Sequence, residues 1–228
     1  MNTIANVEPP KPRLIWQITR AVFIDYFRFF HCVRFRYTRN IPRHGCVVFA
    51  PNHGSYYDPP VVGCGIPFEL RFMAWEALFK VPLVSMFIRN FGAFPVKLKS
   101  ADKHAVELTL NVLREGGMLV MFPEGERTHD GKLATFEKGM ARLALSVGAS
   151  VVPVAVTGAY KCYSRHHLIP HFWRARVMVK YYPAINLEPI TNIREMRDAV
   201  AQLNGQVHHI IERRMRAYDK LVNSQNKS

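Results

Sequence analysis

The chain has 228 residues, of which 49% are hydrophobic, and its 31 Lys and Arg residues outnumber 17 Asp and Glu residues to give a formal net charge of +14. This length suits one compact domain with a sizeable core, and the apolar content excludes a disordered chain. The charge excess indicates an anionic partner, for which nucleic acid, an anionic membrane surface and phosphorylated metabolites all qualify.

The first dozen residues contain three prolines and no apolar core, so we expect no cleavable signal peptide. The cysteines along the chain form no CxxC pair and show no metal-ligand spacing; they are Cys32, Cys46, Cys64 and Cys162. This usage favours a reduced protein that faces the cytoplasm.

Residues 13–37 form an aromatic-rich segment that we predict to be a helix. Its charged residues recur too often for a transmembrane helix, which needs about 20 predominantly apolar residues. Arginines spaced among aromatics suit a membrane interface, where guanidinium groups meet lipid phosphates. The alternative is a helix that packs its aromatic face on the core.

Apolar runs of strand type then alternate with segments of helical periodicity. We predict strands at 46–51, 118–122, 150–158 and 174–183, and helices at 100–117, 135–149 and from Asn192 to about Tyr218. This order predicts an α/β fold: a single domain with a largely parallel mixed sheet flanked by helices, preceded by an N-terminal membrane-interface helix. The expected division is 1–37 for the tail and membrane-associating helix and 38–228 for the α/β domain.

Residues 66–94 are rich in Met, Phe and Trp and are interrupted by prolines. Such side chains adapt to long apolar ligands, and they also fill cores. On composition alone, core filling is the favoured interpretation.

The stretch "NHGSYYD", residues 52–58, follows the first predicted strand. Ligands of open α/β sheets gather at the carboxyl ends of strands. A helix beginning near Ser55 would bring the Asp58 carboxylate within reach of the His53 ring. A carboxylate on one ring nitrogen fixes the tautomer, so the other nitrogen can take a proton from an alcohol. The alternative is a capping Asp beside an exposed His.

The stretch "MFPEGERTHDG", residues 121–131, follows another predicted strand. Gly125 lets the backbone come close to a ligand, and Arg127 offers a planar charged group suited to phosphate. Glu124 could hold a hydroxyl or orient Arg127. Taken alone, the stretch is more typical of a charged surface turn.

Together these motifs resemble the conserved blocks of the glycerolipid acyltransferases typified by bacterial 1-acylglycerol-3-phosphate acyltransferase. "NHGSYYD" resembles their first block, NHxxxxD, and "FPEGERT" their third, FPEGtRS. "GAFPVK" (92–97) resembles the second block and "VVPVAVTG" (151–158) the fourth. The blocks occur in the family's order and cover roughly residues 45 to 160.

The resemblance implies transfer of a fatty acyl group from acyl-CoA or acyl-ACP to a hydroxyl of lysophosphatidic acid or a related lysolipid. It implies His53 as general base and Asp58 as its orienting partner. The residues that it implies for substrate binding are Glu124, Gly125, Arg127, Thr128, Lys97 and Lys99. Backbone amides near Gly54 or Val152 are candidate oxyanion donors.

The same resemblance implies a protein of phospholipid biosynthesis that is membrane-associated on the cytoplasmic face. Its partners would be a phospholipid surface, a lysolipid acceptor and an acyl thioester donor, without nucleic acid, metal or further cofactor. Residues 66–94 would line the acyl chain.

One position departs from the family pattern. The second block commonly ends in an arginine that contacts the acceptor phosphate, and Leu98 stands there in this chain. Lys97 or Lys99 would substitute as a point charge without a bidentate fork. The other possibility is an acceptor that is not a simple glycerol phosphate.

Three rival functions remain. A metal-dependent phosphoesterase would use His53, Asp58, His104 and His129, although HxxxxD is not a usual ligand spacing. A nucleic-acid-binding module would use the basic aromatic segments but leaves both loop motifs without a role. A membrane-binding relative without catalysis would not need the intact His53, Asp58 and Glu124.

Overall fold

The structure, a computed structural model, describes residues 13–96, 103–173 and 175–225. Within these residues one seven-stranded sheet has the order β1-β7-β6-β2-β5-β3-β4. The strands are β1 Arg34–Arg36, β2 Val47–Pro51, β3 Leu70–Trp75, β4 Ala93–Val96, β5 Met118–Val120, β6 Ser150–Thr157 and β7 Met178–Tyr181. The helices are α1 Leu14–His31, α2 Asp58–Cys64, α3 Pro82–Asn90, α4 Lys103–Arg114, α5 Lys138–Val147, α6 Ala159–Tyr163 and α7 Ile193–Gln225, with short 3₁₀ helices η2 Thr38–Asn40 and η3 Glu76–Lys80.

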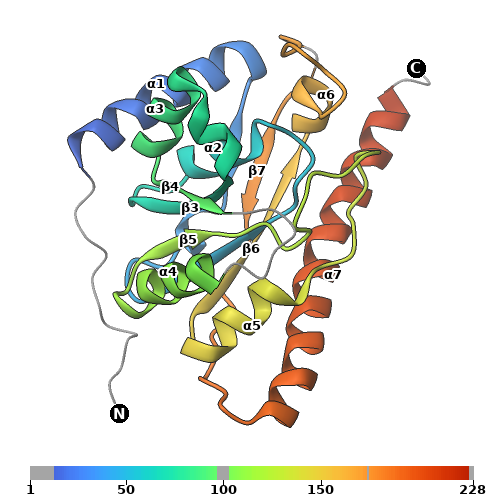
Figure 1. Ribbon diagram of the computed structural model, residues 1–228. Coiled ribbons are helices and arrows are strands. Elements are labelled where there is room, and N and C mark those ends of the chain that lie inside the picture. Colours follow the sequence, from blue (N-terminus) through green and yellow to red (C-terminus); the bar gives the residue numbers. More distant parts are fainter. Residues whose placement is uncertain (1–12, 97–102, 174, 226–228) are drawn as a thin grey trace.

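The sheet is largely parallel, and β6 and β7 form its antiparallel pair. Helices α1, α2 and α3 cover one face, and α4, α5 and α7 cover the other (Figure 1). Parallel sheets are normally buried on both faces in this way. The predicted α/β fold with a largely parallel mixed sheet is therefore confirmed.

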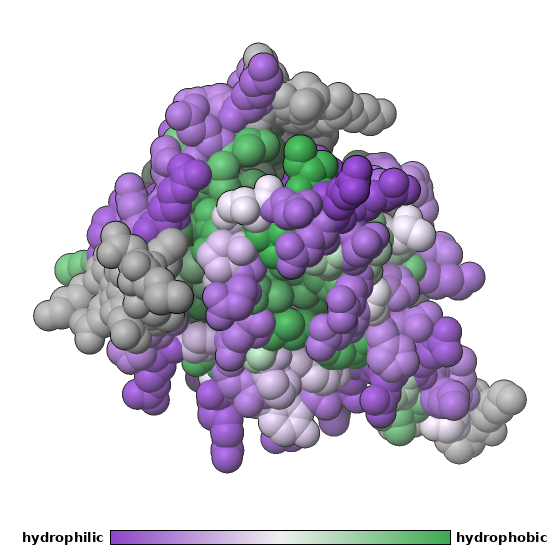
Figure 2. All heavy atoms as spheres, turned by 90° about the horizontal axis from the view of Figure 1, so that it is seen from below, coloured by the Kyte–Doolittle hydropathy of each residue, from purple (hydrophilic) through white to green (hydrophobic). Residues whose placement is uncertain are grey.

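Strand β2 lies at the centre of the sheet and shows how its sequence builds two cores. Val47 and Phe49 pack into the cluster beneath α1 and α2, while Val48 and Ala50 pack into the cluster beneath α5 and α7. Successive side chains of a strand point to opposite faces, so a strand buried on both faces is apolar throughout. From below, Figure 2 shows hydrophobic side chains in the middle of the molecule, surrounded by hydrophilic ones.

The first helix is shorter than predicted. It ends at His31, Cys32 adopts a left-handed conformation with φ of 45°, and the chain continues into β1, which pairs with β7. The prediction of one helix through Tyr37 is thus wrong over its last residues, because pairing with β7 decides their conformation. A boundary at residue 37 also does not separate the N-terminal segment from the sheet.

Residues 66–94 contain β3, η3, α3 and the start of β4, and no strand was predicted there. In β3, Leu70 and Phe72 are buried while Arg71 is exposed. That alternation is the pattern of a strand toward the outside of a sheet, and the many Met and aromatic residues obscured it.

The last helix begins at Ile193 as predicted and continues past Tyr218 to Gln225. The side chain of Asn192 caps it, because its Oδ1 accepts the backbone N–H of Arg194 (2.9 Å). Among the described residues, no helix is both long and apolar enough to cross a membrane.

Candidate active site

The predicted site segments meet at one edge of the sheet. Strand β2 pairs in parallel with β5 on one side and with β6 on the other, so the carboxyl ends of these strands lie side by side. Residues 52–58 follow β2, residues 121–128 follow β5, and Gly158 follows β6. The expected convergence of the strand-end loops is therefore observed.

The structure brings His53 and Asp58 together. Nδ1 of His53 lies 3.0 Å from Oδ2 of Asp58, which is 1% exposed. The same oxygen accepts the backbone N–H groups of Gly54 and Ser55, each at 2.7 Å. Asp58 opens α2, and residues 55–57 form a turn instead of the predicted helix start. Short charge-assisted bonds of this kind hold the carboxylate in place.

This arrangement selects the tautomer of a neutral His53 ring. Since Oδ2 of Asp58 acts as an acceptor, the neutral ring places its proton on Nδ1 and its lone pair on Nε2. Within the described residues Nε2 has no hydrogen-bond partner, and the side chain is 16% exposed. The Gly54 amide donates to Asp58, so it is not free to serve as an oxyanion donor, and Val152 lies buried inside β6.

Two neighbours that sequence reasoning did not assign to the site fix the position of His53. Phe122 stacks on the imidazole, with ring centroids 3.9 Å apart and planes inclined by 24°. The buried Asn52 accepts the backbone N–H of Val156 (2.7 Å) and donates to its carbonyl (2.9 Å). Both residues stand inside the quoted motifs, beside His53 and Glu124, and that adjacency was the available signal.

Glu124, in the loop that follows β5, bonds to the loop that follows β2. Its Oε1 accepts the backbone N–H of His53 (2.6 Å), and its Oε2 accepts that of Ala134 (2.8 Å). The side chain is 6% exposed, and burial raises the pKa of its carboxyl to about 7, although the two N–H donors favour the ionised form. Glu124 is thus bonded to backbone on both oxygens, and among the described residues it has no bond to Arg127.

Arg127 lies flat on an aromatic ring. Its Cζ is 3.5 Å from the ring centroid of Tyr56, which comes from the first motif. Within the described residues its buried Nη1 has no hydrogen-bond partner. A guanidinium held by stacking keeps its N–H donors available for an anion. This geometry allows phosphate binding next to the first motif.

The remaining residues of the third block shape the loop around Arg127. Gly125 has φ of +75°, a conformation that glycine adopts without strain. The backbone N–H of Thr128 donates to the carbonyl of His53 (2.8 Å), and its hydroxyl donates to Asp130 (3.0 Å). The loop is therefore attached to the first motif directly.

The remaining predicted residues fall into two groups. Lys97 and Lys99 lie outside the described residues. His104 is exposed on α4, and His129 contacts Arg165 at 2.7 Å. No group of three or more His, Cys, Asp or Glu side chains in the described ranges is placed to hold a metal ion.

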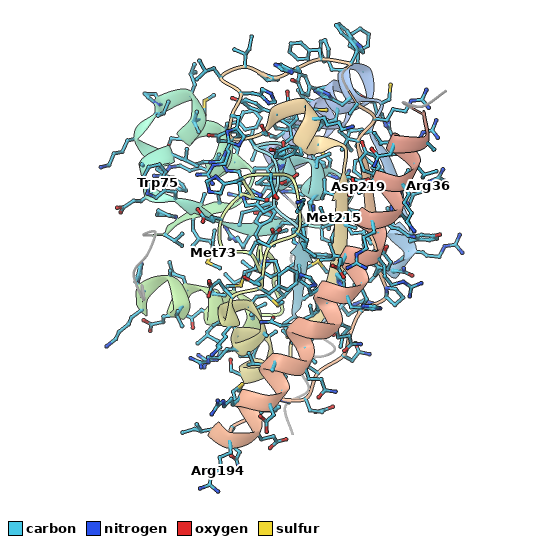
Figure 3. All side chains as sticks on the ribbon, turned by 90° about the vertical axis from the view of Figure 1, so that its right-hand side faces the viewer. Arg36, Met73, Trp75, Arg194, Met215 and Asp219 are labelled. Carbon is cyan, nitrogen blue, oxygen red and sulfur yellow. The ribbon has the colours of Figure 1, made fainter. Side chains whose placement is uncertain are left out.

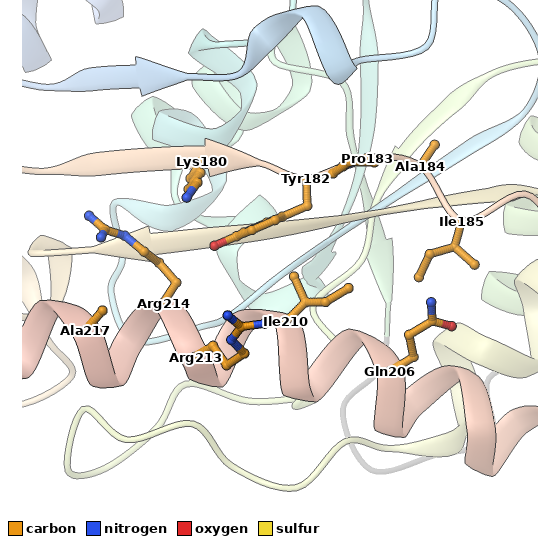
Figure 4. Close-up of a pocket in the computed structure, with 10 residues that line it drawn as sticks. All are labelled: Lys180, Tyr182, Pro183, Ala184, Ile185, Gln206, Ile210, Arg213, Arg214 and Ala217. Atoms are coloured by element: carbon orange, nitrogen blue, oxygen red, sulfur yellow. The ribbon is translucent and has the colours of Figure 1, made fainter.

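Two cavities lie near the C-terminal part of α7. One of about 320 Å³ borders Asn52, Gly54 and Asp58 and reaches Met215 and Asp219 of α7, which are labelled in Figure 3. A larger open groove of about 590 Å³ lies between β7 and α7 and contains none of the predicted site residues (Figure 4). Of these two, the smaller cavity is the one that borders Asp58, and His53 is not among its lining residues.

Comparisons with known proteins agree with the motifs. The sequence profile of the family described as Acyltransferase matches residues 32–157. The 1-acyl-sn-glycerol-3-phosphate acyltransferase of Bacillus subtilis (strain 168) is 28% identical over 120 residues, covering 52% of this chain and 59% of the relative. The lyso-ornithine lipid O-acyltransferase of Pseudomonas aeruginosa is 28% identical over 155 residues, covering 67% of this chain and 57% of the relative. The matched regions thus span less than two thirds of these relatives.

A solved structure is similar over most of the chain. The crystal structure of the 1-acyl-sn-glycerophosphate (LPA) acyltransferase PlsC from Thermotoga maritima superposes with a TM-score of 0.70 at 25% sequence identity. The similarity covers 91% of this chain and 78% of that one.

Proposed function

The chain belongs to the acyltransferase family, and on that premise we propose that it moves a fatty acyl group from an acyl thioester to a hydroxyl of lysophosphatidic acid or a related lysolipid. The donor is acyl-CoA or acyl-ACP. The observation that carries the proposal is the 3.0 Å contact between Nδ1 of His53 and the buried Asp58, at the edge where the strand-end loops converge.

In the proposed mechanism Nε2 of His53 takes the proton from the acceptor hydroxyl as its oxygen attacks the thioester carbonyl carbon. The C–S bond then breaks, and the imidazolium returns the proton to the departing thiolate. Asp58 keeps the ring oriented and stabilises its charged form. A thioester is already activated, so the reaction needs neither a covalent enzyme intermediate nor a cofactor, and base assistance contributes about 10²–10⁴-fold.

We assign the acceptor phosphate to Arg127, whose stacked guanidinium retains an unpartnered Nη1 among the described residues. Gly125 and Thr128 shape this loop, and Glu124 holds it against the backbone of His53. Lys97, the last residue of the second block, and Lys99, two positions later, are proposed to add positive charge.

A second acceptor class is favoured by two observations. The Pseudomonas relative is named a lyso-ornithine lipid O-acyltransferase. In addition, Leu98 stands where the glycerolipid acyltransferases commonly have a phosphate-binding arginine. A lysolipid without glycerol phosphate is therefore the alternative acceptor.

We propose that the enzyme works on the cytoplasmic face of a membrane. Large hydrophobic side chains of α1 and of the η3–α3 region are exposed, and Phe23 of α1 contacts Phe87 of α3 with ring centroids 4.4 Å apart. Helices α1 and α3 therefore present neighbouring apolar surfaces that suit a lipid interface. They include Leu14, Ile18, Val22, Leu83 and Met86.

The test is acyl transfer by purified protein. Labelled acyl-CoA and acyl-ACP are offered with a panel of lysolipids that includes lysophosphatidic acid and lyso-ornithine lipid, and products are identified by mass. The His53→Ala variant is expected to lose at least about 10²-fold in kcat while its circular dichroism stays native. Asp58→Asn, which keeps an acceptor oxygen but loses the charge, should retain more activity than His53→Ala. Near-wild-type turnover in His53→Ala would remove the base from the mechanism.

A further inference from the structure

The loop of residues 164–173, which follows α6, has an exposed apolar tip. Leu168 is 96% exposed and Ile169 is 71% exposed, and Trp173 at the end of the loop is 66% exposed. In the described part of the chain, no other large hydrophobic side chain is as exposed as Leu168. Contiguous exposed apolar side chains of this kind mark a contact with a partner or a membrane.

The loop is held at its base, so the tip is presented in a defined position. The backbone N–H of His171 donates to the carbonyl of Cys162 (2.7 Å), and that of Trp173 donates to the carbonyl of Phe30 in α1 (3.0 Å). The Phe30 ring packs against Phe172 and Trp173, at centroid distances of 4.8 Å and 5.3 Å. The loop therefore continues the exposed apolar surface of α1.

The distribution of charged residues around the tip favours an anionic partner. No Asp or Glu occurs between Glu137 and Glu188 in the sequence. Arg165 and His166 precede the tip, and His171 follows it. Arg165 itself is held within the protein, because its Nη1 donates to the carbonyl of Arg127 and lies 3.9 Å from Oε2 of Glu126. An apolar tip beside imidazole side chains, in a segment without acidic residues, matches an anionic lipid interface, where the tip enters the acyl region below the phosphates.

The base of the loop is also bonded to the segment that carries Arg127. Nη1 of Arg165 donates to the carbonyl of Arg127 (3.1 Å) and contacts Nε2 of His129 (2.7 Å). Nε2 of His166 donates to the carbonyl of His129 (2.8 Å). A change in the position of the loop would thus reach the Arg127 backbone directly.

We propose that residues 164–173 form a second membrane-contacting element, in which Leu168 and Ile169 insert into an anionic phospholipid bilayer. Arg165 links that contact to the position of Arg127. Binding of the enzyme to the membrane that holds its substrate would therefore fix the position of the acceptor-binding loop. The link rests on the proposed function, whereas the insertion itself does not.

The test of insertion measures binding of the full chain to vesicles of phosphatidylcholine and phosphatidylglycerol in equal amounts. The double variant Leu168→Asp with Ile169→Asp should bind at least about tenfold more weakly, because neither side chain would then bury apolar surface in the bilayer. The matched control is Ile193→Asp. Ile193 is 87% exposed beside Arg194 at the N-terminal end of α7 (Figure 3), and this variant should bind like the wild type. In a Trp75→Phe background, which removes the other exposed Trp, Trp173 fluorescence should shift to the blue on vesicles and be quenched by brominated lipid, and a further Trp173→Phe change should abolish that signal.

Equal vesicle affinity of the double variant and the wild type would overturn the proposal. So would a change in the solution mass of the double variant, since that would mean that the tip contacts a second copy of the chain. Neither result bears on acyl transfer, and a wild type that binds vesicles but transfers no acyl group would contradict only the proposed function.

The link to Arg127 is tested separately. Arg165→Ala should bind vesicles like the wild type but raise the KM for lysophosphatidic acid several-fold with kcat retained. An unchanged KM would limit the loop to membrane contact and overturn the link.

Discussion

A single carboxylate oxygen organises the candidate base. Oδ2 of Asp58 accepts the Nδ1–H of His53 and the backbone N–H groups of Gly54 and Ser55. Because the donors converge on one atom, the turn between His53 and α2 and the orientation of the ring are fixed together. Phe122 then restricts the imidazole from its face. Preorganisation of this kind spares the protein from ordering the base during the reaction.

Glu124 gives the protein a pH-dependent stability. Burial raises the pKa of its carboxyl from the ordinary 4.5 to about 7, so the folded protein holds this proton more tightly than the unfolded chain does. The free energy of unfolding should therefore fall as pH rises from about 4.5 to about 7, and Glu124→Gln should lack this part of the slope. Urea unfolding across that range measures both proteins. Exposed Glu126→Gln is the control, and curves for wild type and Glu124→Gln that run parallel would contradict the prediction.

Arg127 should determine acceptor binding more than donor binding. Loss of a charge-assisted hydrogen bond costs about 1.5–3 kcal/mol, so Arg127→Ala should raise the acceptor KM about tenfold or more and leave the donor KM unchanged. Arg127→Lys should recover only part of this, since lysine lacks the planar group that stacks on Tyr56. Steady-state kinetics with each substrate varied would show the difference. Arg142→Ala on the exposed side of α5 serves as the control, and an unchanged acceptor KM in Arg127→Ala would refute the assignment.

At the scale of elements, α1 combines the two interpretations that its sequence left open. Trp16, Phe27 and His31 are buried against the rest of the protein, whereas Ile18 and Val22 are 51% and 63% exposed. One side of the helix thus belongs to the core, and the other is available to a lipid interface.

The two sides of α1 should respond differently to substitution. Ile18→Glu with Val22→Glu should weaken vesicle binding about tenfold or more while leaving the unfolding free energy within about 0.5 kcal/mol of the wild type. Phe27→Ala should instead lower the unfolding free energy by about 3–5 kcal/mol, because it leaves a cavity in the core. Vesicle sedimentation and urea unfolding of each variant check this. Unaltered vesicle affinity in the Glu variant would exclude α1 from the membrane contact.

At the scale of the whole molecule, the site exists because parallel strands end together. The His53 loop follows β2 and the Arg127 loop follows β5, and these strands are adjacent in the sheet although Val120 stands 69 positions after Pro51. Helix α1 contacts both of the other apolar elements: its Phe23 packs against α3, and its Phe30 packs against Trp173 of the loop 164–173. The proposed membrane contact and the proposed chemistry therefore share one framework.

The sequence by itself determined the α/β class, the main strand and helix positions, the contact between His53 and Asp58 and the membership of the family. These follow from local periodicity and from short motifs, in which a spacing of five residues at the start of a helix brings two side chains together. Asn52, Tyr56 and Phe122 stood in those motifs, but nothing local revealed that they bond to Val156, stack on Arg127 or stack on His53.

Only the tertiary structure decided the end of α1, the strands within residues 66–94 and the partners of Glu124. Strand pairing between distant segments fixes the end of α1 and the strands within residues 66–94. The partners of Glu124 are backbone N–H groups, which every residue type except proline carries. Such long-range contacts leave little trace in local sequence, because the backbone groups that make them are the same whatever the side chain.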